Sequence, residues 1–176
     1  LGGSAPLTLD IAQALDNSGG LIASNTDLAL RTSELTNREG TIQGAGDTVM
    51  SVASLDNRQG EIFAGDSLEL DSAGTIDNGQ GQLVAEGDLD ITGTQLINQG
   101  GVLGAVQGVL NIEAASLNNS AGRVEAGNGL RLDVADTLTN AAGEIVQLGD
   151  DVELLIAATT LQGRDGLIVS QGGLTF

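Results

Sequence analysis

The chain has 176 residues and a formal net charge of -18, contains no Cys, His, Trp or Tyr, and all six of its basic residues are Arg. Without imidazole or thiol groups it lacks the usual zinc and copper ligands, a Cys nucleophile and any disulfide. Its negative charge argues against nucleic acid or an anionic membrane surface as a partner, since both attract basic surfaces.

The apolar content indicates a folded chain. Hydrophobic residues make up 40% of the sequence and charged residues 17%, which is too apolar for a disordered acidic tail. No run approaches the roughly 20 apolar residues of a transmembrane segment, and the N-terminus has no secretory signal pattern. Because the chain does not begin with Met, we expect it to be an excerpt of a longer protein.

A repeated unit runs through the chain. The alternating segment Leu7–Ile11 matches the second half of a unit. From Leu15 onward, a Leu or Ile recurs every 20 to 23 residues, with Asn two positions later and Gly five positions later; Gly163 replaces the Asn of the last unit. The Leu or Ile positions are Leu15, Leu35, Leu55, Ile76, Leu96, Leu117, Leu138 and Leu161. The Asn positions are Asn17, Asn37, Asn57, Asn78, Asn98, Asn119 and Asn140.

Within each unit, apolar and polar residues alternate, which is the period of a half-buried strand and does not fit a helix. Gly and Asn recur at fixed offsets, where we expect the chain to bend and to use positive φ angles. Each unit is therefore predicted to form two or three short strands separated by tight corners.

One unit cannot fold alone. In the unit from Leu55 to Thr75, the inward candidates are Leu55, Ile62, Ala64, Leu68 and Leu70. The four large side chains stabilise the fold by roughly 1.5–3 kcal/mol each when buried, whereas ordering about 20 residues costs roughly 20–40 kcal/mol. Stacked units share one core and pair their strands. The sequence therefore predicts an all-β fold, a parallel β-helix or β-solenoid of seven to eight coils of about 20–21 residues, roughly 35–40 Å long.

Two irregularities refine this prediction. The unit beginning at Leu138 is longer, and we expect a bulge or small loop at Leu154–Ala158. The segments Leu7–Ile11 and Gly173–Phe176 are partial units without a visible cap, which solenoid ends usually carry. Residues 1–176 are therefore predicted to form a single solenoid segment of a longer array.

The units Leu55-Asp56-Asn57-Arg58-Gln59-Gly60-Glu61-Ile62 and Leu117-Asn118-Asn119-Ser120-Ala121-Gly122-Arg123-Val124 resemble the haemagglutinin repeats of filamentous haemagglutinin-like exoproteins. The resemblance covers the chain from about Leu7 to Phe176. It implies a right-handed coil, two-partner secretion through a dedicated outer-membrane transporter, and a place on the surface of a Gram-negative bacterium. Members of the family include large adhesins, haemolysins and effector carriers of contact-dependent growth inhibition, with roles in cell adhesion and virulence.

The same resemblance points to the repetitive shaft of such proteins. The Asn-Pro-Asn motifs of their secretion domain are missing, since Pro6 is the single proline, and so is the Val-Glu-Asn-Asn sequence that marks the toxin boundary. The leading hypothesis is a non-enzymatic shaft that presents a distal adhesive or toxin module. The alternative is that the segment itself binds a receptor or glycan, around the expanded coil at residues 150–160.

Two columns of polar residues are candidate sites. We expect the Asn column to be a structural ladder of stacked amides, with ligand binding as the alternative. Asp residues recur near the second corner, where they are expected to face solvent and to bond the turn backbone. Calcium bridging at this edge is the alternative, because calcium prefers carboxylate oxygens; no other cofactor or metal is expected. These aspartates are Asp27, Asp47, Asp66, Asp88 and Asp150.

Other charged residues suggest little chemistry. Arg38 and Arg58 share one offset, which predicts a surface ion-pair cluster with Glu39 and Glu61. Carboxylates two apart on a strand, as in the pairs Glu69/Asp71 and Asp88/Asp90, are the arrangement that polysaccharide-cleaving β-helices use. Nearly every strand offers such a pair, so spacing selects none, and we expect no enzymatic activity.

Overall fold

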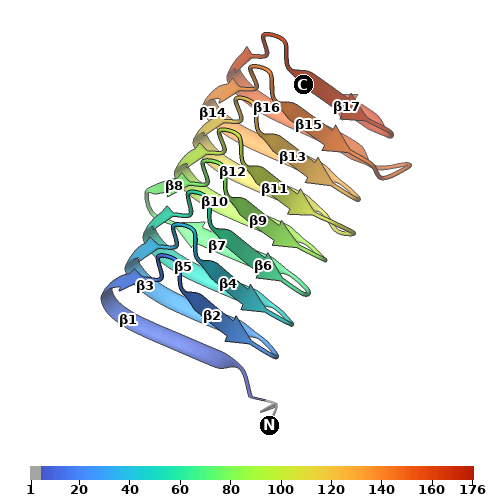
Figure 1. The fold of residues 1–176 in the computed structure, drawn as a ribbon. Coiled ribbons are helices and arrows are strands. Elements are labelled where there is room, and N and C mark those ends of the chain that lie inside the picture. Colours follow the sequence, from blue (N-terminus) through green and yellow to red (C-terminus); the bar gives the residue numbers. More distant parts are fainter. Residues whose placement is uncertain (1–4) are drawn as a thin grey trace.

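The computed structural model describes residues 5–176, and every regular element among them is a β-strand. The chain winds into a stack of coils that rises from the N-terminal to the C-terminal end (Figure 1). A coil contributes one long and one short strand, and the strands of successive coils pair in parallel. This arrangement confirms the predicted parallel β-solenoid of about eight coils.

The strands form two sheets. The long strands make a parallel sheet of ten strands, in which β8 continues the side of the coil begun by β7. These strands are β1 (Leu7–Asp16), β3 (Leu28–Thr36), β5 (Thr48–Asp56), β7 (Leu68–Ser72), β8 (Thr75–Asp77), β10 (Leu89–Ile97), β12 (Leu110–Asn118), β14 (Leu130–Thr139), β16 (Glu153–Gln162) and β18 (Gly173–Thr175). The short strands make a sheet of eight. They are β2 (Leu21–Ser24), β4 (Thr41–Gly44), β6 (Glu61–Ala64), β9 (Gln82–Ala85), β11 (Val102–Ala105), β13 (Arg123–Ala126), β15 (Glu144–Gln147) and β17 (Leu167–Ser170).

The core is a set of stacked apolar columns. Leu89 pairs with Leu68 of the coil below and with Leu110 of the coil above, so equivalent side chains lie over one another. All five inward candidates of the unit that starts at Leu55 are buried, with at most 2% of their surface exposed. The buried cluster consists of Leu, Ile, Val and Ala side chains together with Met50. The inward residues predicted for this unit are therefore confirmed.

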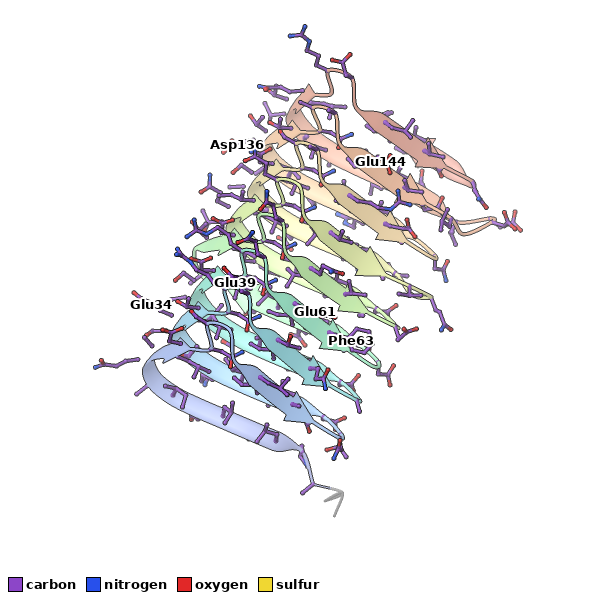
Figure 2. The ribbon with its side chains drawn as sticks, in the orientation of Figure 1. Glu34, Glu39, Glu61, Phe63, Asp136 and Glu144 are labelled. Carbon is purple, nitrogen blue, oxygen red and sulfur yellow. The ribbon has the colours of Figure 1, made fainter. Side chains whose placement is uncertain are left out.

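The long strand bends in its middle, which gives each coil a third corner. In β3 the alternation of buried and exposed residues is interrupted by Ser33 and Glu34, which are both exposed. In the coil of β7 and β8 the bend at Ala73 and Gly74 separates the two strands. Glu34 and Asp136 project from this bend in two different coils (Figure 2).

Hydroxyl groups stabilise the bend, a device that the sequence pattern did not reveal. Thr94 Oγ1 donates a hydrogen bond to the carbonyl oxygen of Ala73 in the coil below, at 3.0 Å. Thr159 Oγ1 donates in the same way to Ala135, at 2.7 Å. The bend takes these carbonyl groups out of the regular ladder, so a neighbouring hydroxyl supplies the missing donor.

The longer unit carries its extra residues in a turn. The predicted bulge at Leu154–Ala158 is wrong, because this segment is a regular strand that pairs in register with Leu130–Val134. Leu154 follows Gln147 by seven residues, whereas Leu130 follows Ala126 by four. The added residues therefore lie in the turn at positions 148–152, between β15 and β16.

Candidate functional site

The seven asparagines lie at one corner of the coil, directly after the long strand, and their side chains point inward. Asn37 and the five later members are fully buried, and Asn17 is 8% exposed. From Asn17 to Asn119, each amide nitrogen donates to the amide oxygen of the next coil, for example from Asn37 Nδ2 to Asn57 Oδ1 at 2.8 Å. Six such bonds of 2.7–2.8 Å connect Asn17 to Asn140.

Each asparagine also ties the corner of its own coil to the strand above. Asn98 Nδ2 donates to the carbonyl oxygen of Gly101, at 3.2 Å, and to that of Arg123 in the next coil, at 3.1 Å. Its Oδ1 accepts the bond from Asn78 below. The buried amide therefore has partners for both of its polar atoms, which removes the desolvation cost of burying it.

Glycine is required at this corner for space. A Cβ on Gly60 would lie 2.0 Å from the carbonyl oxygen of Asn37 in the coil below, and Gly60 does not have a positive φ. The residue with positive φ is the one before this glycine. In this coil it is Gln59, with a φ of 58°, and in two other coils it is itself a glycine, Gly19 or Gly100. The expectation that the recurring Gly supplies positive φ is therefore wrong: close approach of two coils selects it.

A second column caps the turn from outside. The residue before each Asn projects outward, and in several coils its side chain accepts the N–H of the residue after the Asn. Asp77 Oδ1 accepts from Gly79 at 3.0 Å, and Asn118 Oδ1 accepts from Ser120 at the same distance. Asp16 accepts both the hydroxyl and the N–H of Ser18, and these hydrogen bonds lower the pKa of its carboxyl group.

The predicted Asp column is shorter than the sequence suggested. Asp47 precedes Thr48, which pairs with Leu68, so the residue above Asp47 is Ser67 rather than Asp66. Asp47 Oδ1 accepts the Ser67 N–H at 3.1 Å, and Asp27 and Asp88 accept backbone N–H groups of the next coil in the same way. Asp66 lies one position earlier, and Asp150 lies in the expanded turn. Placing these two aspartates in the column was therefore wrong.

The arginine cluster forms with other partners than those predicted. Arg38 and Arg58 both bind Asp56 Oδ2, at 2.6 and 2.8 Å, and Arg58 also lies 3.6 Å from Asp77. Glu39 and Glu61 are not in this cluster. All of these groups reach solvent, so their contribution to stability is modest.

On the outer face of the short-strand sheet, Glu61, Phe63 and Glu144 are exposed or half-buried (Figure 2). Arg123 of β13 lies on this sheet between Glu125 and Glu144 and pairs with both. Its hydrogen bond to Glu125 is the largest cause that raises the pKa of the guanidinium group.

The carboxylates that stand two apart on their strands face solvent. Glu69, Asp71, Asp88 and Asp90 are all exposed on the outside of the coils. Within residues 5–176, no three carboxylates lie close enough together to hold a metal ion. The described part of the chain also contains no helix with the length and apolar character needed to cross a membrane.

The expanded turn is anchored by a buried glutamine. Gln147 occupies the inward position that Ala126 has in the coil below and is fully buried. Its Nε2 donates to the carbonyl oxygens of Asn128 and Gly149, at 3.0 and 2.6 Å, and its Oε1 accepts the hydroxyl of Ser170 at 2.6 Å. These bonds hold the turn in place, with Leu148 39% exposed on it.

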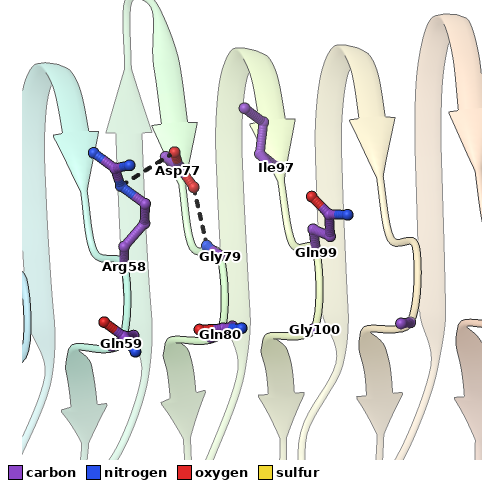
Figure 3. Close-up of a pocket in the computed structure, with 9 residues that line it drawn as sticks. Arg58, Gln59, Asp77, Gly79, Gln80, Ile97, Gln99 and Gly100 are labelled. Atoms are coloured by element: carbon purple, nitrogen blue, oxygen red, sulfur yellow. Dashed lines mark hydrogen bonds and ion pairs between the residues drawn. The ribbon is translucent and has the colours of Figure 1, made fainter.

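A shallow hollow of about 670 Å³ lies on the outside of the Asn corner, above Arg58 (Figure 3). Asp77, Gly79 and Gln80 line it from one coil, and Ile97 lines it from the next. Sequence reasoning missed this hollow, since its residues are unremarkable until the coils are stacked.

Comparison with known proteins agrees with the geometry. A family model described as the haemagglutinin repeat matches residues 4–80 and 64–176, which together cover residues 4–176. No curated protein and no solved structure matches the chain.

Proposed function

Because the chain belongs to the haemagglutinin repeat family, we propose that it is the non-enzymatic shaft of a secreted, cell-surface filamentous exoprotein. In this role it presents a distal adhesive or toxin module. Family membership and the solenoid support a filamentous adhesin-like shaft and suggest a secreted or cell-surface protein. Export, the distal module and origin in a Gram-negative bacterium are the parts that we propose.

The observation that carries the proposal is the uninterrupted pairing of coils. Both sheets are parallel along the described chain, with register shifts in three pairs of long strands, and the asparagine ladder links Asn17 to Asn140 without a break. Bending the rod would separate coils on one side and break strand pairs and buried amide bonds together. Such a stack resists bending, which is what a spacer requires.

One experiment distinguishes the shaft role from a binding role. A fluorescently labelled chain is incubated with epithelial and bacterial cells at micromolar concentrations. The shaft role predicts no saturable binding. A matched variant replaces residues 148–153 with the shorter turn at 127–129. Saturable binding that is lost in this variant would overturn the shaft proposal and support the alternative.

That alternative is that the expanded turn binds a receptor or glycan. The specific observation in its favour is that Gln147 bonds the backbone of a turn that carries an exposed leucine and two aspartates, where other coils have a tight turn. Asp150 and Asp151 form the tip of this turn, and Leu148 lies at its base. A turn that is anchored before a partner arrives loses little entropy on binding.

The cellular context follows from the family. The haemagglutinin repeat implies two-partner secretion, and we propose that a dedicated outer-membrane transporter exports the full-length protein. Co-expression with such a transporter should release the protein from the cell, and release without it would contradict the proposal. We propose no nucleic-acid partner and no cofactor.

Calcium at the edge predicted from Asp27, Asp47, Asp66 and Asp88 stays a prediction for Asp27, Asp47 and Asp88, with Asp66 one position earlier on the chain. A calcium-dependent rise in melting temperature that disappears in Asp47→Asn would support it, and an unchanged melting temperature would contradict it.

Catalysis is not part of the proposal. The haemagglutinin repeat is a structural fold family and is not typically enzymatic. Incubation with surface polysaccharides should release no new reducing ends. Their appearance, and their loss in Asp71→Asn or Asp90→Asn, would contradict the non-enzymatic role.

A further inference from the structure

The hollow at the Asn corner exists because two neighbouring coils depart from the repeat. The residue before the Asn is a capping Asp at positions 56 and 77 and a capping Asn at position 118. At position 97 it is Ile, which cannot accept the backbone N–H. The coil loses its outer cap and gains a half-buried aliphatic surface.

Glycines open the space beside this surface. Gly79 occupies the position that Arg38 and Arg58 have in the two coils below, so no long side chain extends from that position over the hollow (Figure 3). Asp77 and Asn118 are the residues in register with Ile97 on the coils below and above. Gly100 occupies the position of Gln59 and Gln80. A Cβ on Gly79 would meet Asp77 Oδ1 at 3.1 Å, a contact that a small shift relieves, so a side chain is tolerated there.

Three amides line the hollow along the turn. Gln59, Gln80 and Gln99 are exposed, and their side chains make no hydrogen bond to other groups among residues 5–176 (Figure 3). Each amide offers donors and an acceptor in one plane. Gln59 and Gln80 stand at equivalent places on neighbouring coils, which puts their amides about 4.8 Å apart along the rod.

The charges in the hollow are already satisfied. Arg58 is neutralised by Asp56 at 2.8 Å and faces Asp77 at 3.6 Å, while Asp77 also accepts the Gly79 N–H. An anionic ligand finds no free cation there and is repelled by the net charge of -18. A cationic ligand finds no free carboxylate. The groups that remain are neutral amides beside an aliphatic floor.

We propose that this hollow binds a neutral oligosaccharide. Vicinal hydroxyls both donate and accept hydrogen bonds, as the glutamine amides do, and the apolar face of a sugar ring fits against Ile97. The hollow is shallow and supplies few bonds, so the expected affinity of one site is millimolar. Binding this weak is not detected by the micromolar cell-binding experiment, so the proposal goes beyond the shaft role and can fail independently of it.

The test is an NMR titration of the ¹⁵N-labelled chain with maltohexaose, cellohexaose and xylohexaose. We expect at least one of these neutral sugars to shift the side-chain amide resonances of Gln59, Gln80 and Gln99 along a saturable curve. If none does so at millimolar concentrations, the proposal is wrong. It is also wrong if only a sulfated hexasaccharide shifts these resonances, because the ligand class would then be anionic.

Two matched pairs of variants locate the site. Gly79→Arg fills the hollow with a side chain that the coils below already carry and should abolish the shifts, whereas Ala141→Arg, at the same offset two coils above Gln99, should retain them. Gln80→Ala should weaken binding about tenfold, as expected for the loss of its hydrogen bonds, whereas Gln82→Ala on the neighbouring strand should not. Shifts that persist in both Gly79→Arg and Gln80→Ala would overturn the assignment.

Discussion

Removing one rung of the asparagine ladder tests whether the buried amides hold the coils together. Asn98→Ala removes the acceptor of the Asn78 amide at 2.8 Å and the donor to Asn119 Oδ1 at 2.7 Å. The Asn78 amide keeps the carbonyl oxygens of Gly81 and Val102 as acceptors, but the fully buried Asn119 Oδ1 is left without a donor, and water cannot replace it. An unpaired buried polar group costs about 1–3 kcal/mol, so Asn98→Ala should lower the free energy of unfolding by about that amount.

The assay is guanidinium unfolding followed by far-UV circular dichroism, because the chain has no Trp or Tyr for fluorescence. The matched control is Asn118→Ala, which removes a cap on the half-buried outer side of the same corner. Its groups reach water, so the expected loss is about 0.5–1.5 kcal/mol. If Asn98→Ala costs no more than Asn118→Ala, the ladder does not stabilise the stack.

An ionisable group introduced at position 98 gives a test by pH. Asn98→Asp places a buried carboxyl group against the carbonyl oxygens of Gly101 and Arg123, so its folded-state pKa should be raised. The stability of this variant is then greatest below the unfolded pKa of about 3.9 and is lost as the pH rises through the raised folded pKa. Stability that increases from pH 4 to pH 7 would refute the reasoning.

Three further substitutions test the packing, each by the midpoint of guanidinium unfolding. Leu96→Asp buries an unpaired carboxylate at a fully buried position and should prevent cooperative folding, and an unchanged midpoint would show that Leu96 does not face the core. Gly60→Ala should lower the free energy of unfolding by about 3 kcal/mol or more. Its control is Gly104→Ala, whose Cβ would meet only the Val84 methyl groups at 3.7–3.9 Å and should stabilise the strand by about 0.5–1 kcal/mol. Equal effects of the two substitutions would contradict the close approach of coils at Gly60. Thr48→Val removes a buried hydroxyl that has no partner in the described residues and should raise stability by about 1 kcal/mol, and a loss would mean that the hydroxyl is bonded.

The sequence predicted the coil well at positions that have the same structural role in every unit. Leu96 and Ile62 are buried because alternation fixes the inward face of a strand, and stacking preserves that face through the whole array. The hand of the coil does not follow from residue spacing. The bend of the long strand was also not foreseen, because Ser33 and Glu34 look like ordinary exposed residues until the phase of the alternation changes across them.

Errors arose where the partner of a residue lies in another coil. Arg38 was assigned to a glutamate close in sequence, but its partner is Asp56 in the next coil. Asp66 looked like a member of the Asp column because a one-residue difference in turn length is invisible without the strand register. The register of neighbouring coils, rather than the content of one unit, decides these contacts.

The corner explains how a repetitive shaft can carry local chemistry without losing its shape. The inward Asn and the close-packed Gly at each corner are constrained by the coils above and below, as the 2.0 Å approach at Gly60 shows. The outward residues between them are exposed or half-buried and are not packed into the core, so Asp77 and Ile97 can occupy the same position in adjacent coils. Because each coil contacts only its neighbours, replacing an outer cap by an aliphatic side chain costs stability in that coil alone. A hollow such as the one around Ile97 can therefore form on the surface while the ladder beneath it remains complete.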